Sequence, residues 1–289
     1  MNELLANIIN GIAFGGLLFI LASGFSLALG VLRVINIAHG AFYLLCVYLG
    51  VTIARVAGGF LSALVVDSLA IMVLAALLHR LLLRRFNLAP LPQVLATYGV
   101  TLIIAQSVRL IWGGYTEVMD TPSALDGTVL LFGTIVPVYR LFLIGVAIVL
   151  AVTLWLLIER TRLGALVRAS VDDEEIARSI GIDVNRLATM LFAFTGFLVG
   201  MGGALGAPLL GGYPGVEWEI LTLTLIVVVV GGLGSVAGAF IGSLLVGILW
   251  NVGIAYFDQY AYFVLFAPMI LVLSVRPRGL LGKKMVIGE

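Results

Sequence analysis

The residues whose types and spacing could do chemistry form a short capped helix that would bind another protein. Asp172 is a favourable N-cap residue, and Glu175 follows at the spacing of a capping box. Asp173 and Glu174 place negative charge in the first turn, where the helix dipole favours it. Gly181 supplies the C-terminal stop. The pattern predicts a helix of about eight residues, which is too short to be stable alone in water.

This helix carries one apolar face. Glu174 and Arg178 are four residues apart in the favourable order for a surface ion pair. Ile176 and Ile180 share a face with Ala177 beside them, and that face needs a partner. Two interpretations stay open on this pattern. Either the helix inserts into another protein, or it belongs to a charged loop between two membrane helices.

Catalytic and metal-binding patterns are missing from the sequence. It has no HExxH, no paired cysteine ligands and no acidic cluster, and Cys46 is its one cysteine, so no internal disulfide can form. It also lacks GxxxxGK[ST], the pattern that cradles nucleotide phosphates. Metal and hydrolase chemistry therefore have no support in the residues, and we do not expect this chain to hold a nucleotide itself.

The composition is that of a membrane protein. Of its 289 residues, 62% are hydrophobic and 11% are charged, whereas soluble domains have about 25% charged residues. Long apolar runs recur throughout and predict an all-α polytopic protein with about 8–10 membrane helices. The expected helices cover about 4–31, a run ending near 55, 60–83, 94–112, 138–158, 187–210, 220–230, 236–257 and a last run ending near 275.

Basic residues predict the orientation. The segments 79–85, 159–186 and 276–289 hold three, five and four Lys or Arg residues, together 12 of the 16 in the chain. The loops 113–137 and 211–219 hold none. By the positive-inside rule the first group is cytoplasmic and the second external, with about nine crossings. The apolar run 220–230 is short for a full span of about 20 residues, so we expect a broken or re-entrant helix there.

Polar groups inside the apolar runs are few. Asp67 is expected at the external interface of its helix, and Arg109 is expected to extend towards the interface beside Trp112. His39 follows Asn36 in a glycine-bearing turn, where a lone histidine is more often a structural hydrogen-bonding group than a ligand. We expect a largely uncharged substrate path lined by hydroxyl and amide groups. Its candidates are Asn36, His39, Thr97, Gln106, Thr222 and Thr224.

Glycines at four-residue spacing predict close helix packing. Gly234, Gly238 and Gly242 form one such series. A strip without side chains allows another helix to approach closely. We expect a packing role for these glycines and no ligand.

Four motifs carry a resemblance to a known family. They are NIAHG at 36–40, TRLGALVRASVDDEEIARSIGIDVNRL at 161–187, GGLGSVAGAFIGSLLVG at 231–247 and RPRGLLGK at 276–283. Together they resemble the shorter of the two membrane permeases of branched-chain amino acid ABC importers. The likeness covers nearly the whole chain, which we treat as one permease domain, 1–289. Residues 163–183 resemble the family's cytoplasmic loop, which implies a coupling helix seated on an ATPase.

The resemblance also implies that this subunit has no enzyme activity and no cofactor of its own, and that it works with partners. A second related permease would complete the pore, and two cytoplasmic ATP-binding subunits would hold ATP and Mg²⁺. A periplasmic or lipid-anchored binding protein would deliver substrate, and no nucleic acid is involved. The protein would then lie in the bacterial inner membrane with 159–186 and the C-terminus cytoplasmic.

The substrate and two other functions stay open. Related permeases move branched-chain amino acids, urea, short amides and small organic acids. An ion-coupled carrier would need buried acids or histidines, for which Asp67 and His39 are the candidates. A passive channel would not need a capped cytoplasmic helix.

Overall fold

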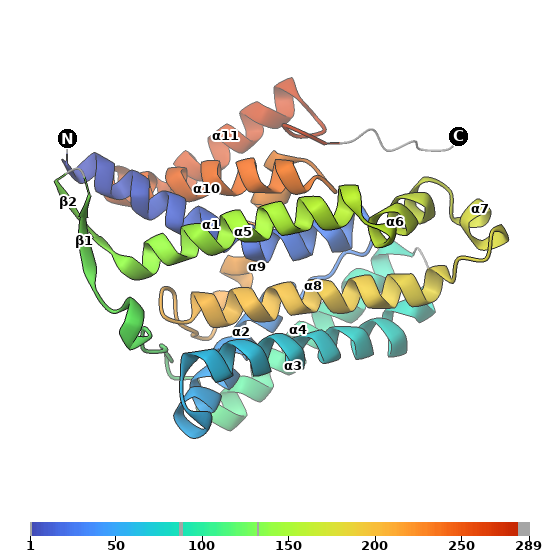
Figure 1. Ribbon diagram of the computed structural model, residues 1–289, viewed down its shortest axis with the longest axis horizontal. Helices are drawn as coiled ribbons and strands as arrows, with labels where there is room; N and C mark the ends of the chain where they lie inside the picture. The colour runs from blue at the N-terminus through green and yellow to red at the C-terminus, as the bar shows by residue number, and fades with distance from the viewer. Residues whose placement is uncertain (1, 87–88, 132, 283–289) are drawn as a thin grey trace.

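The computed structural model describes residues 2–86, 89–131 and 133–282 and is almost entirely helical (Figure 1). Among the described residues, seven helices are long and apolar enough to cross a membrane. They are α1 (Asn2–Gly30), α2 (Ala38–Ala57), α3 (Phe60–Leu81), α4 (Pro90–Trp112), α5 (Val138–Arg160), α8 (Val184–Gly206) and α10 (Val236–Phe257). The predicted all-α membrane fold is confirmed.

Four shorter helices complete the helical part. They are α6 (Arg162–Asp172), α7 (Glu174–Ser179), α9 (Val216–Gly231) and α11 (Ala261–Val275). At 16 and 15 residues, α9 and α11 extend about 24 Å and 22 Å at 1.5 Å per residue. Both are shorter than the hydrocarbon core of a bilayer, about 30 Å. The expected short helix near 220–230 is therefore present as α9.

Helix α1 is the centre of the bundle. Of its apolar window, 89% is buried inside the protein, against 17% for α4 and α5. It lies against α5, α8, α9 and α10 (Figure 1). Gly11 and Gly15 allow the approach of α10, because a Cβ on Gly11 would lie 2.6 Å from the Ile248 Cα and one on Gly15 would lie 2.7 Å from the Ser243 carbonyl oxygen.

Some predicted boundaries were wrong. Helix α4 begins at Pro90 and not near 94, because prolines at the first helical positions lack only an N–H that has no helical partner. Helix α8 begins at Val184 and not near 187, since the Asp183 carboxylate accepts a hydrogen bond from the Arg186 amide at 3.0 Å and caps it.

The loop 113–137 contains structure that the sequence did not indicate. Strands β1 (Thr128–Leu131) and β2 (Thr134–Pro137) form an antiparallel hairpin, with Thr128 opposite Pro137. A single turn of 3-10 helix, Ser123–Leu125, precedes them. We expected only a polar loop here.

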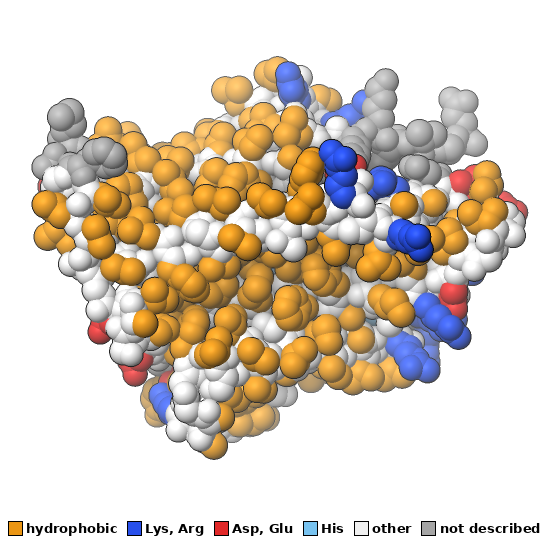
Figure 2. Space-filling view, viewed as in Figure 1, with side chains coloured by type: hydrophobic (Ala, Val, Ile, Leu, Met, Phe, Trp, Pro, Cys, Tyr) orange, Lys and Arg blue, Asp and Glu red, His pale blue; other side chains and the backbone are white. Residues whose placement is uncertain are grey.

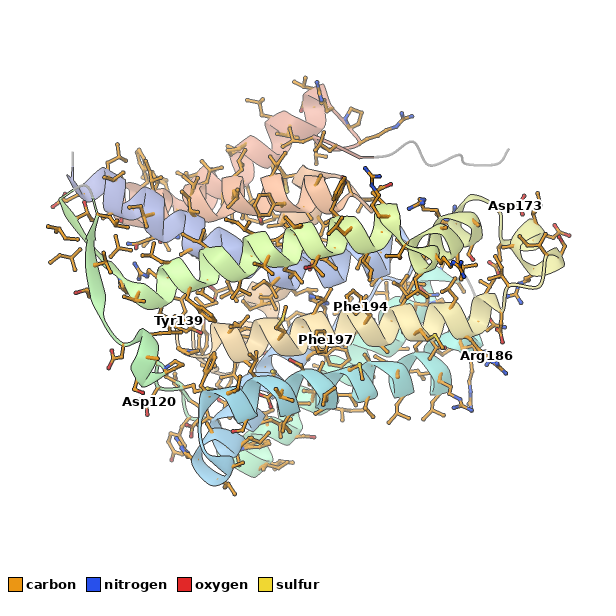
Figure 3. All side chains as sticks on the ribbon, viewed as in Figure 1. Asp120, Tyr139, Asp173, Arg186, Phe194 and Phe197 are labelled. Atoms are coloured by element: carbon orange, nitrogen blue, oxygen red, sulfur yellow. The ribbon has the colours of Figure 1, made fainter. Side chains whose placement is uncertain are left out.

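The loop 113–137 and the segment 159–186 lie at opposite ends of the bundle. Figure 3 shows Asp120 and Tyr139 at one end and Asp173 and Arg186 at the other. On the face shown in Figure 2, most of the Lys and Arg side chains gather towards the end that carries α6 and α7, and the flanks between the ends are mainly apolar. Apolar flanks between polar ends are what a bilayer requires of a protein that spans it.

Candidate functional site

The segment 159–186 folds into two helices, and the N-cap of α7 is Asp173. The Asp173 Oδ1 accepts a hydrogen bond from the Ile176 amide at 2.9 Å. The predicted N-cap, Asp172, is instead the last residue of α6, so Glu175 lies at the second helical position and the predicted capping box is wrong. The helix has six residues, fewer than the eight expected, because α6 extends through residues that we assigned to a loop.

Helix α6 is fixed to the end of α5. The Thr161 hydroxyl accepts a hydrogen bond from the Gly164 amide at 3.2 Å and caps α6. The Arg168 guanidinium donates to the Ile158 carbonyl and lies 3.7 Å from the Glu159 carboxylate. These contacts hold α6 against the end of α5, and α7 follows α6 and projects beyond the bundle (Figure 1).

The apolar residues of α7 differ in burial. Ala177 is buried, whereas Ile176 and Ile180 are 60% and 68% exposed. Ala177 is therefore not part of the exposed face that we expected it to share with the isoleucines. The predicted Glu174–Arg178 pair is present at 2.7 Å, and Glu175 is exposed.

Gly181 ends α7 in a left-handed conformation. Its φ is +90°, which glycine adopts without the strain that a Cβ causes. Its amide donates to the Arg178 carbonyl at 3.0 Å, and the Ile182 amide donates to the Ala177 carbonyl at 3.0 Å. These two bonds form a Schellman motif, which fixes the direction in which the chain leaves α7.

A second group of polar residues lies where α2 begins. The Asn36 Oδ1 accepts from the Ala38 amide at 3.1 Å, and the Thr97 hydroxyl of α4 accepts from the Ile37 amide at 3.2 Å. The His39 Nε2 lies 3.1 Å from the Leu21 carbonyl oxygen. Since an N–H must point at that oxygen, His39 holds α2 against α1.

Helix α9 begins beside this point. A Cβ on Gly40 of α2 would overlap the Glu217 backbone, so the first turns of α2 and α9 touch. The buried Glu217 carboxylate accepts from the Gly215 amide at 2.8 Å. Trp218 and Tyr98 are 38% and 43% exposed, and their ring centroids are 5.7 Å apart. The first turns of α2 and α9 thus lie beside the Tyr98–Trp218 pair, at the surface formed by α4 and α9.

The six predicted path residues do not surround one cavity. Asn36, His39, Thr97 and Thr224 are buried, and their side chains bond to backbone of this chain. Thr222 lies one turn after Trp218 and donates to its carbonyl at 2.7 Å, and Gln106 is exposed two turns after Tyr98 on α4. Gln106 and Thr222 therefore reach the surface that carries the aromatic pair.

The predicted packing glycines lie at helix contacts. A Cβ on Gly234 would lie 3.3 Å from the Gly30 Cα, and one on Gly242 would lie 2.7 Å from the Val227 carbonyl oxygen. A Cβ on Gly238 would overlap the Gly231 carbonyl oxygen. Helices α9 and α10 are therefore in backbone contact.

Asp67 is buried inside the helix bundle. Its exposed fraction is 0%, and neither carboxylate oxygen has a hydrogen-bond partner among the described residues. It lies beside Gly50 of α2 and the Met119 methyl group. We expected Asp67 at the external interface of its helix; it is enclosed by α2, α3 and the Met119 side chain, which belongs to the loop 113–137.

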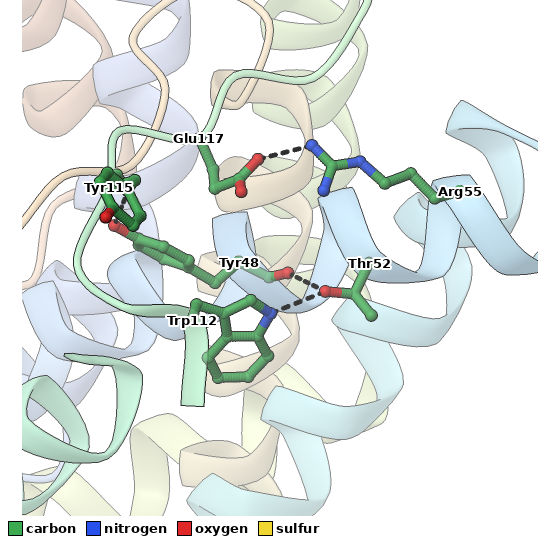
Figure 4. A network of polar contacts seen from close by, with 6 residues as sticks. All are labelled: Tyr48, Thr52, Arg55, Trp112, Tyr115 and Glu117. Carbon is green, nitrogen blue, oxygen red and sulfur yellow. Dashed lines mark hydrogen bonds and ion pairs between the residues drawn. The ribbon is translucent and has the colours of Figure 1, made fainter. Parts of the chain in front are cut away.

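A polar network joins the loop 113–137 to α2. Figure 4 shows it, formed by Tyr48, Thr52, Arg55, Trp112, Tyr115 and Glu117. Arg55 donates to Glu117 at 2.7 Å, and the Trp112 indole donates to the Thr52 hydroxyl at 2.8 Å. Glu117 also exchanges backbone bonds with Gly212 at 2.8 Å and 2.9 Å. The network joins the loop to two distant parts of the chain.

Sequence reasoning missed Tyr98, Trp218 and the buried Glu217. Aromatic residues in apolar helices are usually core residues, so their exposure could not be foreseen. The one available signal is Trp218 between two glutamates in an apolar stretch. Within the described residues, no group of three His, Cys, Asp or Glu could hold a metal ion.

A family model described as "Branched-chain amino acid transport system / permease component" matches residues 7–273. The chain belongs to this permease family. The permease is 28% identical to the high-affinity branched-chain amino acid transport system permease protein BraD of Pseudomonas aeruginosa, over 96% of each chain. It is 26% identical to LivH of Escherichia coli, also over 96% of each chain.

Similarity extends to a more distant transporter. The ribose import permease protein RbsC of Haemophilus influenzae is 28% identical over 64% of this chain and 57% of its own length. No solved structure matches the permease. Its family is one of transport proteins, and it is a multi-pass membrane protein.

Proposed function

We propose that this permease is one of two membrane subunits of an ABC importer for branched-chain amino acids or similarly small amphipathic solutes. Separate ATP-binding subunits supply the energy, and a binding protein delivers the substrate. The near full-length similarity to the branched-chain amino acid permeases BraD and LivH supports the substrate class.

The exposed isoleucines of α7 are the observation that carries the coupling role. Apolar side chains at the tip of a charged segment are costly to leave in water, and burying Ile176 and Ile180 in an ATPase groove would contribute about 1.5–3 kcal/mol each. Arg178 and Glu174 are exposed and paired with each other, so they would add about 1 kcal/mol or less. The isoleucines therefore determine the affinity for the ATPase. The charges of Glu174, Arg178, Asp173 and Glu175 adjust how α7 is aligned in the ATPase groove.

The surface formed by α4 and α9 lines the substrate path against the second permease. Tyr98, Trp218 and Thr222 present aromatic and hydroxyl groups there, with Gln106 further along α4. An uncharged path suits a permease that receives its substrate from a binding protein. In this arrangement the end with α6 and α7 is cytoplasmic and the end with the β-hairpin is periplasmic, in the bacterial inner membrane.

An ion-coupled carrier is the alternative with a specific observation in its favour, the buried Asp67. Asp67 is enclosed by α2, α3 and the Met119 side chain, and it does not line the pocket that Gln93 and the segment 159–186 border. A coupling ion would need a route to it. We therefore prefer the ATP-driven importer.

Co-purification tests the proposal. The permease is expressed with its partner permease and the ATP-binding subunits. The amount of ATP-binding subunit that co-purifies with each permease is then measured. Ile176→Asp should release the ATPase or uncouple hydrolysis from transport, because it places a charge in the apolar contact. Glu175→Gln, on the same helix and exposed, is the matched control and should be mild. Normal coupling in Ile176→Asp would exclude this role for α7.

A further inference from the structure

We propose that the pocket behind the segment 159–186 binds an amino acid with an aliphatic side chain from the cytoplasm. The proposal rests on the proposed function, because it places the product of import beside the segment that contacts the ATPase. The ligand class follows from three features of the pocket, namely an unpartnered amide oxygen, balanced charges and an apolar wall.

The pocket joins three parts of the chain that are far apart in sequence. Its volume is about 360 Å³, at the lower end of the range of about 300–1,000 Å³ for small-molecule sites. Residues 31–34 between α1 and α2 form one side, and the end of α3 with the first turn of α4 forms another. The third side comes from α6, α7 and the start of α8. A ligand here would touch the bundle and the 159–186 segment at once.

Gln93 supplies an unused acceptor. It lies in the pocket wall in the first turn of α4 and is 4% exposed. Its Oε1 is buried and has no hydrogen-bond partner among the described residues. A buried amide oxygen without a partner is costly, and a turn of the Gln93 amide into the pocket would let a ligand N–H remove that cost. The ligand should therefore carry a donor such as an ammonium group.

The charged groups of the pocket are balanced in sign. Arg33 and Arg84 line it, and neither makes an ion pair within the described part of the chain. Asp173 and Glu174 line the side that comes from the segment 159–186, each with one carboxylate oxygen already bonded, to the Ile176 amide and to Arg178 respectively. Two guanidinium groups attract a carboxylate, and the two acids attract an ammonium. A ligand with one charge of each sign matches this arrangement, whereas a simple anion or cation matches only half of it.

Most of the other lining residues are aliphatic, and His79, Ser170 and Asn185 add polar groups to the wall. The aliphatic residues include Val34, Leu83, Val167, Val171, Val184 and Leu187. Aliphatic side chains without aromatic rings suit a branched aliphatic group. Combined with the balanced charges, this wall selects an aliphatic amino acid over a sugar or a nucleotide.

Occupancy would regulate the importer. A ligand that contacts both the bundle and the segment 159–186 favours one placement of α7, and the ATPase that receives α7 favours one placement too. Linkage then requires that ligand and ATPase each change the affinity for the other. The direction that fits an importer is inhibition, in which accumulated product slows ATP hydrolysis.

Binding of L-leucine to the purified full-length permease tests the site. Calorimetric titration in phosphatidylglycerol nanodiscs should show binding. It should weaken at least tenfold for 4-methylpentanoate, which lacks the amine, and for 3-methylbutylamine, which lacks the carboxylate. Gln93→Leu and Arg84→Ala should each weaken leucine binding at least tenfold. Arg85→Ala is the matched control, since Arg85 is the exposed neighbour of Arg84 and does not line the pocket.

Two control variants distinguish a lost binding site from an unfolded protein. Gln93→Leu should melt no lower than wild type, because it removes an unpartnered buried oxygen, so its loss of binding would not reflect unfolding. Thr153→Ala should keep full binding, since Thr153 is exposed on α5 and lines neither the pocket nor the proposed path. Unchanged binding in both Gln93→Leu and Arg84→Ala would overturn the site. Loss of leucine binding when phosphatidylethanolamine is added to the discs would also overturn the site, because the occupant would then be a lipid headgroup.

The regulatory part has its own readout. In the assembled importer, millimolar leucine without binding protein should lower ATP hydrolysis severalfold in wild type and in Arg85→Ala, but not in Gln93→Leu. Leucine binding with unchanged hydrolysis would overturn the regulation. If the ATPase does not associate at all, the proposed function fails while the binding experiment on the permease alone still decides the site.

Discussion

Gly200 of α8 and Asp67 of α3 meet backbone to backbone. A Cβ on Gly200 would lie 2.8 Å from the Asp67 carbonyl oxygen and 2.7 Å from the Ser68 Cα. A Cβ on Gly196, one turn earlier, would lie 2.7 Å from the Ile71 carbonyl oxygen. This contact holds the second half of α8, the helix that follows the segment 159–186, in a fixed position on α3.

Gly200→Ala should destabilise the permease. Its methyl group can be accommodated only by moving α3 away from α8, and overpacking of this kind costs about 1–3 kcal/mol. Gly145→Ala is the control, because Gly145 lies within α5 with nothing near its missing Cβ, and it should be neutral or stabilising by about 0.5–1 kcal/mol. Melting temperatures of the two variants in detergent measure the difference, and equal values would contradict the close contact.

Asp67→Asn should preserve folding and transport. The carboxyl is buried without a hydrogen-bond partner in the described structure, so the neutral amide of the same shape avoids any cost of burying a charge. Asp67→Lys should abolish expression of folded protein. Uptake by cells expressing each variant is the measurement. Folded Asp67→Asn protein that cannot transport would favour the ion-coupled carrier.

Gly181→Val should impair coupling of hydrolysis to transport. Valine at a φ of +90° is strained by about 1–3 kcal/mol, and nothing lies within 4 Å of the missing Cβ, so the effect comes from the backbone alone. The strain would redirect the exit from α7. Gly181→Asn should be milder, because asparagine tolerates the left-handed region. Substrate-stimulated ATP hydrolysis of the two variants should differ, and equal values would argue against a role for the Schellman motif.

Cysteines at Ser123 and Ser179 should report opposite sides of the membrane. Both positions are exposed, and the native Cys46 is buried and should stay silent. With an impermeant thiol reagent applied from the periplasmic side, we expect labelling at Ser123→Cys only. Labelling of Ser179→Cys alone would reverse the proposed orientation.

Trp218→Ala should slow substrate uptake while the complex still assembles. Its ring is at the surface with Tyr98, and in the proposed importer that surface lines the path. Thr224→Val, on the same helix but buried against its own backbone, should have little effect. Uptake assays with matched amounts of complex compare them. Wild-type uptake in Trp218→Ala, or loss of assembly, would remove this surface from the path.

The sequence alone determined the fold class, the opposite placement of 113–137 and 159–186 and the presence of a short helix near 220–230. These follow from hydrophobic run length and from the distribution of basic residues, which are local properties of the chain. The ion pair of Glu174 with Arg178 and the left-handed Gly181 were also predicted, because both depend on residues within one or two turns.

Only the tertiary structure decided which side chains meet. Whether Asp67 is buried depends on how α2 and the Met119 side chain pack against α3. Whether Ala177 or Ile176 faces outward depends on how α7 packs against α6 and α8. The pairing of Tyr98 with Trp218 joins residues 120 positions apart. The pocket around Gln93 likewise needs three distant segments. Contacts of this kind depend on packing between helices, which the pattern of apolar residues along each helix does not specify.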